Sequence, residues 1–300
     1  MTAQYIRQCN LVVSNAAGEG LDLSTLRITF AIKKTDGQTP NTATIRVYGL
    51  SENAANQIQA EFTQVDLQAG YQSNFGVIFS GTAKRIRKGR ESNVDSFLEI
   101  QAADGDGAYN FAVVNATISA GATQRDQIEQ AAKVMQAKGV TQGYIAPDNS
   151  QALPRGKVMY GTSRDYLRQS SETVGASWSI QDGKLQLVPL TGVLPNQAVV
   201  LNSKSGLVGQ PEQTNDGVKF RCLLNPNLQI AAMVQIAQKD VQQAALEESD
   251  KVPAVIAVDG FYRIIAMEFS GDTRGNDWYC EGVGLSVDST APTDKSVKVN

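Results

Sequence analysis

The chain has 300 residues, a formal net charge of -3 and no histidine. Its length predicts two or three domains, and its slight negative charge gives no general attraction to nucleic acid or anionic lipid. Because histidine is the commonest general base and metal ligand, its absence excludes most familiar hydrolase mechanisms.

The cysteines and the apolar runs exclude further classes. Cys9, Cys222 and Cys280 are far apart, odd in number and lack C-x-x-C spacing, which argues against a zinc site or a disulfide framework. Residues 1–10 contain no signal-like apolar run, and no stretch approaches the roughly 18 apolar residues of a membrane span. We therefore expect a protein made in a cytoplasm, without a membrane partner, metal or cofactor.

The first region opens with a predicted hairpin. Apolar side chains occupy every second position between residues 26 and 33, which is typical of a strand with one buried face. Turn residues follow at 36–40, and a second alternating run at 44–49 provides the partner strand.

A short helix follows this hairpin. Ser51 is a predicted N-cap, and Ala54, Ala55, Ile58 and Phe62 fall at helical spacing behind it. Further strands are predicted at 65–71, 76–86 and 97–102. Many strands and one helix indicate a barrel or split barrel over residues 1–105.

The second region, residues 106–195, is predicted as an α+β module. Thr123 and Asp126 form a capping-box arrangement before a helix that Gly139 ends. A strand is expected at 157–160, and Ser163 is expected to cap a second helix.

That second helix should end at Gly175, and a hairpin should follow it. Asp182-Gly183 is a type I′ turn signal that places Trp178 and Ile180 opposite Leu185 and Leu187.

The third region, residues 196–288, returns to strands and indicates a second barrel. The strands are predicted at 218–222, 233–237, 261–269 and 278–285. Residues 238–251 are polar and charged without an apolar stripe, so a long exposed hairpin loop is expected there. Residues 289–300 lack periodicity, so a flexible C-terminal tail is expected.

Several patterns superficially resemble functional sites. Residues 104–107 (DGDG) begin like a calcium loop, but the acids required further along are missing, so an acidic turn is preferred. Residues 271–277 are glycine-rich but match no nucleotide-binding spacing, and a hairpin turn is preferred. Glu247, Glu248 and Asp250 lie together on a polar loop, where a raised carboxyl pKa for glycosidase chemistry is not expected.

The densest basic run is Lys84, Arg85, Arg87, Lys88 and Arg90. Nucleic-acid contact needs such charge beside a phosphate backbone. Aromatic residues are few here and Glu91 is adjacent, so a solvated or intersubunit face is preferred over specific nucleic-acid binding.

The order of these regions, together with four stretches of sequence, resembles the hub proteins of the tails and baseplates of tailed bacteriophages. The stretches are 41–51 (NTATIRVYGLS), 205–212 (SGLVGQPE), 217–226 (GVKFRCLLNP) and 260–278 (GFYRIIAMEFSGDTRGNDW). The resemblance covers nearly the whole chain and includes no catalytic signature. It implies two tail-tube-like β-barrel (split-barrel) domains, 1–105 and 196–288, flanking the α+β module.

The resemblance also implies a function. A hub of this kind, in contractile or related long-tailed phages, is a homotrimer that adapts the six-fold tail tube to the three-fold central spike. Its implied partners are the spike, the tail tube or tube-initiator protein, the tape measure protein and surrounding baseplate proteins. It would be a structural virion protein without enzymatic activity, assembled in the host cytoplasm.

Two other functions are alternatives: a tail tube or tube-initiator protein, and a carbohydrate-active tail enzyme or sugar-binding module that uses Trp178 or Trp278. Both tryptophans lie in strand patterns, so a packed core role is preferred for them. Strand edges must be covered or blunted, and the polar loop is long enough to reach a neighbour. The predicted intersubunit or partner contacts are therefore Asp240, Gln242, Glu247, Glu248, Asp250 and Lys251.

Overall fold

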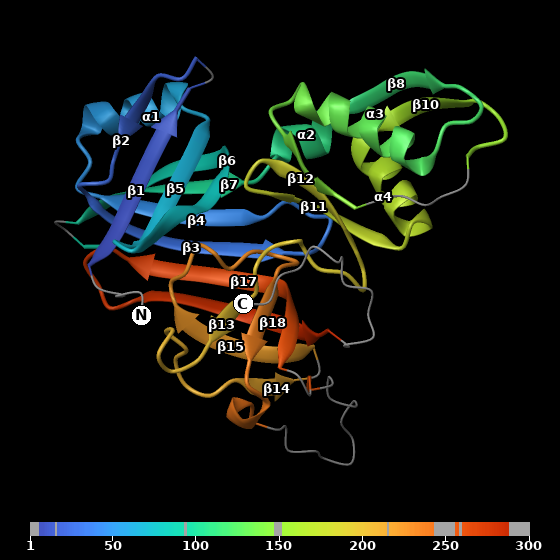
Figure 1. Cartoon of the computed structure of the whole chain (residues 1–300). Helices are drawn as coiled ribbons and strands as arrows, with labels where there is room; N and C mark the ends of the chain where they lie inside the picture. The colour runs from blue at the N-terminus through green and yellow to red at the C-terminus, as the bar shows by residue number, and fades with distance from the viewer. Residues whose placement is uncertain are drawn as a thin grey trace, which may run out of the picture. The chain divides into compact units, whose positions relative to one another are not determined.

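The chain folds into two compact units in a computed structural model that describes residues 6–15, 17–92, 95–146, 152–214, 216–242, 256–257 and 260–287 (Figure 1). Unit 1 comprises Met1–Thr35, Thr42–Ala102 and Thr191–Asn300. Unit 2, called the insertion module below, comprises Asp36–Asn41 and Ala103–Leu190. None of the helices in the described residues has both the length and the apolar character needed to cross a bilayer.

Unit 1 is built on one thirteen-stranded sheet. The first strand group consists of β1 (Arg7–Ser14), β2 (Gly20–Asp22), β3 (Arg27–Thr35), β4 (Thr42–Tyr48), β5 (Gln64–Tyr71), β6 (Asn74–Arg90) and β7 (Ser96–Ala103). The second strand group consists of β13 (Val199–Leu201), β14 (Glu212–Thr214), β15 (Gly217–Leu223), β16 (Met233–Ile236), β17 (Phe261–Asp272) and β18 (Trp278–Ser286).

The two strand groups remain contiguous within this sheet. The main order is β14-β15-β18-β17-β3-β4-β7-β6-β5-β1-β2, with β16 paired to β17 and β13 paired to β16. The prediction of a mainly β protein is confirmed. The finer prediction of two barrels is not, because the described strands close no barrel: β3 and β17, expected in different barrels, pair with each other instead.

The predicted hairpin at the start of the chain is confirmed. Strands β3 and β4 pair antiparallel, and the alternating side chains of Ile28, Phe30 and Ile32 are buried. Helix α1 (Glu52–Glu61) follows, and the Ser51 side chain accepts a hydrogen bond from the backbone N–H of Ala54. This cap satisfies one of the donors that a helix start leaves without an intrahelical partner.

The insertion module combines helices with two small sheets. It contains α2 (Asp106–Phe111), β8 (Val113–Ile118), α3 (Gln124–Gln136), β9 (Thr141–Ile145), β10 (Lys157–Thr162), α4 (Ser163–Thr173), β11 (Ala176–Gln181) and β12 (Lys184–Pro189). Strands β8 and β10 form one sheet, and β11, β12 and β9 form the other. The predicted α+β character of this part of the chain agrees with these elements.

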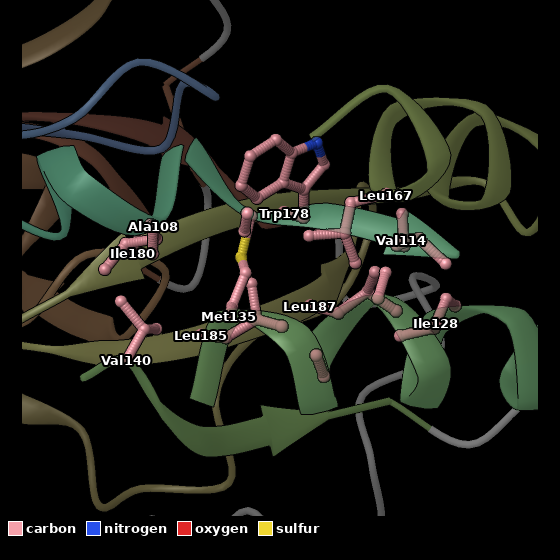
Figure 2. Close-up of a cluster of buried hydrophobic side chains, with 14 of the residues drawn as sticks. Ala108, Val114, Ile128, Met135, Val140, Leu167, Trp178, Ile180, Leu185 and Leu187 are labelled. Atoms are coloured by element: carbon pink, nitrogen blue, oxygen red, sulfur yellow. The ribbon is translucent and has the colours of Figure 1, made fainter. Parts of the chain in front are cut away.

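One apolar cluster holds the insertion module together (Figure 2). Trp178 of β11 is fully buried in it, and Tyr109 stacks on the indole at a centroid distance of 6.3 Å. Met135 of α3, Leu167 of α4 and Val114 of β8 are also buried in the cluster (Figure 2). Helices and both small sheets therefore contribute to the core. Full burial of side chains of this size contributes about 1.5–3 kcal/mol each.

The local signals in the module are confirmed with small corrections. The capping box between Thr123 and Asp126 is present, and Asp182 and Gly183 adopt the positive φ angles of the predicted turn. The second helix is capped by Thr162 rather than Ser163, because Thr162 is the last residue with extended backbone. The first helix ends at Gln136, before the left-handed Gly139.

Several elements were not predicted: α2 and strands β1, β2, β8, β9, β13 and β14. Most are short, so their alternation covers too few residues to stand out. The predicted loop at 238–251 begins with a 3₁₀ turn, η1 (Gln238–Asp240), and its residues 243–251 lie outside the described residues.

Candidate functional site

The pairing of β3 with β17 joins the two strand groups. It runs from Thr35 opposite Ala266 to Thr29 opposite Asp272. At its end, the Arg27 guanidinium lies 2.7 Å from the Asp272 carboxylate, and this hydrogen bond lowers the pKa of Asp272 below its usual range. Backbone pairing and a charge-assisted bond therefore fix the two groups in one register.

Polar contacts outside the sheet also join the two strand groups. The side-chain amide of Asn74, the first residue of β6, donates to the side chain of Asn225 at 2.8 Å. Arg7, at the start of β1, donates to the carbonyl oxygens of Gly275 and Asn276 at 2.7 and 3.0 Å. Strand ends of the first strand group thus contact loops of the second, in addition to the paired strands.

A buried carboxylate lies on the outward face of the first strand group. Glu99 alternates along β7 with the core residues Leu98 and Ile100, which places it on the opposite face of the sheet. Its carboxylate accepts hydrogen bonds from Arg87 and Arg46, each at 2.8 Å. The bond from Arg87, followed by that from Arg46, holds the pKa of Glu99 below its usual range.

The second strand group carries more exposed ion pairs. Lys33 of β3 lies 3.7 Å from Glu268 of β17. Lys219 and Arg221 of β15 lie 3.4 and 3.6 Å from Glu281 of β18. These side chains are 40–67% exposed, so each pair contributes about 0–1 kcal/mol. Their main effect is to make the outward face of the sheet polar.

The basic run noted in the sequence lies along the end of β6. Arg87 donates a hydrogen bond to the carboxylate of Glu99, and Lys88 donates to the side chain of Asn56 on α1. Arg85 and Arg90 are exposed and have no hydrogen-bonded or ionic partner among the residues that the structure describes. The run therefore contains both cations that bond within the chain, Arg87 and Lys88, and cations that make no such bond to any described residue, Arg85 and Arg90.

The predicted contact residues are placed only in part. The backbone N–H of Gln242 donates to the carbonyl of Pro211, and its carbonyl accepts from Gln213, so Gln242 covers the edge of β14. The Asp240 side chain is half-buried, and its backbone N–H donates to the carbonyl of Ala237. The remaining predicted contacts, Glu247, Glu248, Asp250 and Lys251, lie outside the described residues.

The candidate chemistry weighed from the sequence has structural explanations. Asp104 is fully buried, and its carboxylate accepts from the backbone N–H groups of Asp182 and Gly183 at 2.5 and 2.8 Å. It therefore fixes the β11–β12 turn. Within the described ranges there is no cluster of His, Cys, Asp or Glu suited to a metal ion.

The tryptophans proposed as a sugar platform are core residues. Trp178 and Trp278 are both 0% exposed. Trp278 packs edge-on against Phe30 at a centroid distance of 5.5 Å. A sugar ring cannot stack on either indole without unfolding its surroundings, and the packed core role preferred from the sequence is confirmed for both residues.

Solved structures of tail proteins share this fold. A tail protein from Neisseria meningitidis aligns with a TM-score of 0.58 at 10% identity, covering 93% of this chain and 96% of that chain. The 43 kDa tail protein of prophage MuSo2 from Shewanella oneidensis aligns with a TM-score of 0.60 at 8% identity, covering 94% and 98%. An E. coli type VI secretion component, described as structurally similar to T4 tail proteins gp27 and gp5, aligns at 0.56 with 11% identity, covering 91% and 75%.

The fold is therefore that of a tail protein. The sequence matches the family described as "Baseplate hub gp41" over residues 11–283, and the chain belongs to this family. It is a structural component of a phage tail baseplate, as the resemblance predicted. No curated protein matches the sequence.

Proposed function

We propose that three copies of this chain form the ring-shaped hub that adapts a six-fold tail tube to a three-fold central spike. The observation that carries this proposal is the arrangement of two strand groups in one sheet, joined by β3 and β17. Two such groups per chain would supply six positions in a trimer. A closed ring also covers strand edges that would otherwise stay open.

In this proposal the chain consists of three domains and a C-terminal segment. Residues 1–105 and 196–288 are the two tube-like domains, residues 106–195 are the module inserted between them, and residues 289–300 are the C-terminal tail. Fixed register at the β3–β17 pairing would hold the two tube-like domains at a constant spacing. That constancy is what a symmetry adaptor requires of each subunit.

The partners follow from this role. The central spike and the tail tube or tube-initiator protein would bind opposite ends of the ring, and the tape measure protein and surrounding baseplate proteins would contact it as well. Asp240, Gln242, Glu247, Glu248, Asp250 and Lys251 are proposed as intersubunit or partner contacts. Assembly would take place in the host cytoplasm, before release of the virion.

The proposal assigns no enzymatic activity to the chain. A sequence without histidine, and acids that serve as hydrogen-bond acceptors at Glu99 and Asp104, support a structural role. A tail tube or initiator protein is the weaker alternative, since one strand group per chain suffices for a tube and the family match names a hub.

The test combines the mass in solution with a peptidoglycan-clearing assay. The purified chain, alone and with its spike and tube partners, should sediment as a trimer and leave peptidoglycan intact. A chain that stays monomeric with both partners present would refute the ring. Clearing that disappears when one Asp or Glu is replaced would refute the structural role.

A further inference from the structure

The end of the β6–β7 hairpin presents a basic surface. Lys88 and Arg90 are exposed there, and these two residues are called the basic hairpin surface below. Acids are near: Glu52 begins α1, and Glu91 and Asp95 lie in the turn. The Asp95 side chain accepts from the Ser92 hydroxyl, and among the described residues neither Glu91 nor Asp95 has a hydrogen bond or ion pair with Lys88 or Arg90.

A hollow lies beside these cations. Its volume is about 550 Å³, and Leu50, Ala55, Phe97 and Leu98 provide apolar lining. Lys88 and Arg90 contribute its basic lining, and Glu52 is the acid that lines it. A fitting occupant would therefore combine an apolar side chain with carboxylates a few residues away.

A segment of this chain has that chemistry, and in sequence it directly follows a residue at the edge of β14. Residues 243–255 read QAALEESDKVPAV, and Leu246 directly precedes Glu247 and Glu248. With Asp250 and Lys251, the segment contains three acids and one base. The acids of the segment are opposite in charge to the basic hairpin surface, and the Leu246 side chain matches the apolar lining of the hollow.

The segment is too short to reach this surface along its own sheet. Its 13 residues connect Gln242 to Ile256, so its midpoint extends at most about 25 Å from either end. Gln242 bonds at the edge of β14, and seven strand spacings separate β14 from β6, which is about 34 Å along the sheet. The surface on a second copy is therefore the fitting site.

We propose that the acidic segment of one copy docks on the basic hairpin surface of the next copy, with Leu246 in the hollow and Glu247 and Glu248 beside Lys88 and Arg90. This inference rests on the proposed ring and identifies the surface that receives the arm. Each copy would offer one segment and accept one, which is the head-to-tail arrangement that closes a ring of three.

Reciprocal charge reversal in the full chain tests the docking. The hairpin variant Lys88→Glu/Arg90→Glu and the segment variant Glu247→Lys/Glu248→Lys should each weaken trimer association at least tenfold in sedimentation experiments. Combining the four substitutions should restore association, since the charges are again opposite. Lys138→Glu/Lys204→Glu is a matched control with exposed lysines elsewhere, and it should leave association unchanged. Circular dichroism should give the same folded signal for all variants.

The outcomes separate this inference from the proposed function. A trimer that tolerates the hairpin variant would overturn the docking while leaving the ring intact. A wild-type chain that never associates, even with spike and tube partners, would overturn both. Failure of the combined variant to recover would also overturn the docking, because unpaired charge would then not be the cause.

Two further measurements exclude other occupants. Zero-length cross-linking of a mixture of ¹⁴N- and ¹⁵N-labelled chains should join Lys88 to Glu247 or Glu248 between isotopes; cross-links within one isotope alone would overturn docking between copies. A fluorescein-labelled DNA duplex should show no binding that the hairpin variant abolishes. Such binding, with an unchanged trimer, would assign the surface to nucleic acid instead.

Discussion

Unit 1 and the insertion module are stabilised in different ways. In the module, one apolar cluster around Trp178 gathers side chains from within residues 103–190 (Figure 2). In unit 1, the joining contacts link distant parts of the chain, such as Arg27 with Asp272, 245 positions apart. The module therefore depends on a local core, whereas unit 1 also depends on strand pairing and polar bonds between its two strand groups.

The largest expected effect is the loss of the Trp178 side chain. Trp178→Ala should lower the free energy of unfolding of the module by about 3–5 kcal/mol, because it leaves a cavity in a closely packed core. Hydrogen exchange should show faster exchange of β11 and β12 amides, with β3 and β17 amides still protected. Equal loss of protection in β3 and β17 would show that the two units do not unfold separately.

Trp178→Phe is the matched control for this substitution. The indole Nε1 of Trp178 is buried without a hydrogen-bond partner among the described residues. Phenylalanine removes that unpaired donor and retains most of the apolar ring. The loss of stability should therefore be well below that of the alanine variant.

The second prediction concerns the polar bonds of unit 1. Glu99→Gln should lower the free energy of unfolding by about 2 kcal/mol at neutral pH, because hydrogen bonds from Arg46 and Arg87 to a charged acceptor become bonds to a neutral one. Denaturant titration of both proteins measures the difference. An unchanged midpoint at pH 7 would contradict a stabilising role for the carboxylate.

The effect of Glu99 should depend on pH. Its pKa is lowered in the folded chain, so the unfolded state binds a proton first as the pH falls. The stabilisation is therefore fully present above the unfolded pKa of about 4.3 and is lost as the pH falls through the lower folded pKa. Wild type and Glu99→Gln should converge in stability in that acid range and differ at neutral pH.

The smallest expected effect is at the exposed pair of the same sheet. Lys33→Met should change the free energy of unfolding by less than about 1 kcal/mol, since Lys33 and Glu268 are exposed and 3.7 Å apart. Thermal unfolding of the variant beside Glu99→Gln tests this directly. A loss of stability as large as that of Glu99→Gln would mean that the contribution of an ion pair in this sheet does not depend on its burial.

Parts of the candidate site could be predicted from the sequence and parts could not. The basic run and the acidic loop are visible as composition, because charge is a property of each residue. Which cations of the basic run bond within the chain was not visible. Arg87 is bonded to Glu99, and Arg85 has no partner in the described part of the chain, although the two are neighbours in the same run.

The sequence by itself determined the local elements of this protein. Alternation located β3 and β4, Ser51 and Thr123 capped helices, and Asp182-Gly183 set a hairpin, since each depends on interactions among residues close in the chain. Tertiary structure alone decided that β3 pairs with β17 and that residues 36–41 join the insertion module, where Asn41 donates to the carbonyl of Ile180 at 3.0 Å. Strand edges present the same backbone groups whatever their sequence, so the choice of partner depends on which edges and buried acceptors the rest of the fold leaves within reach.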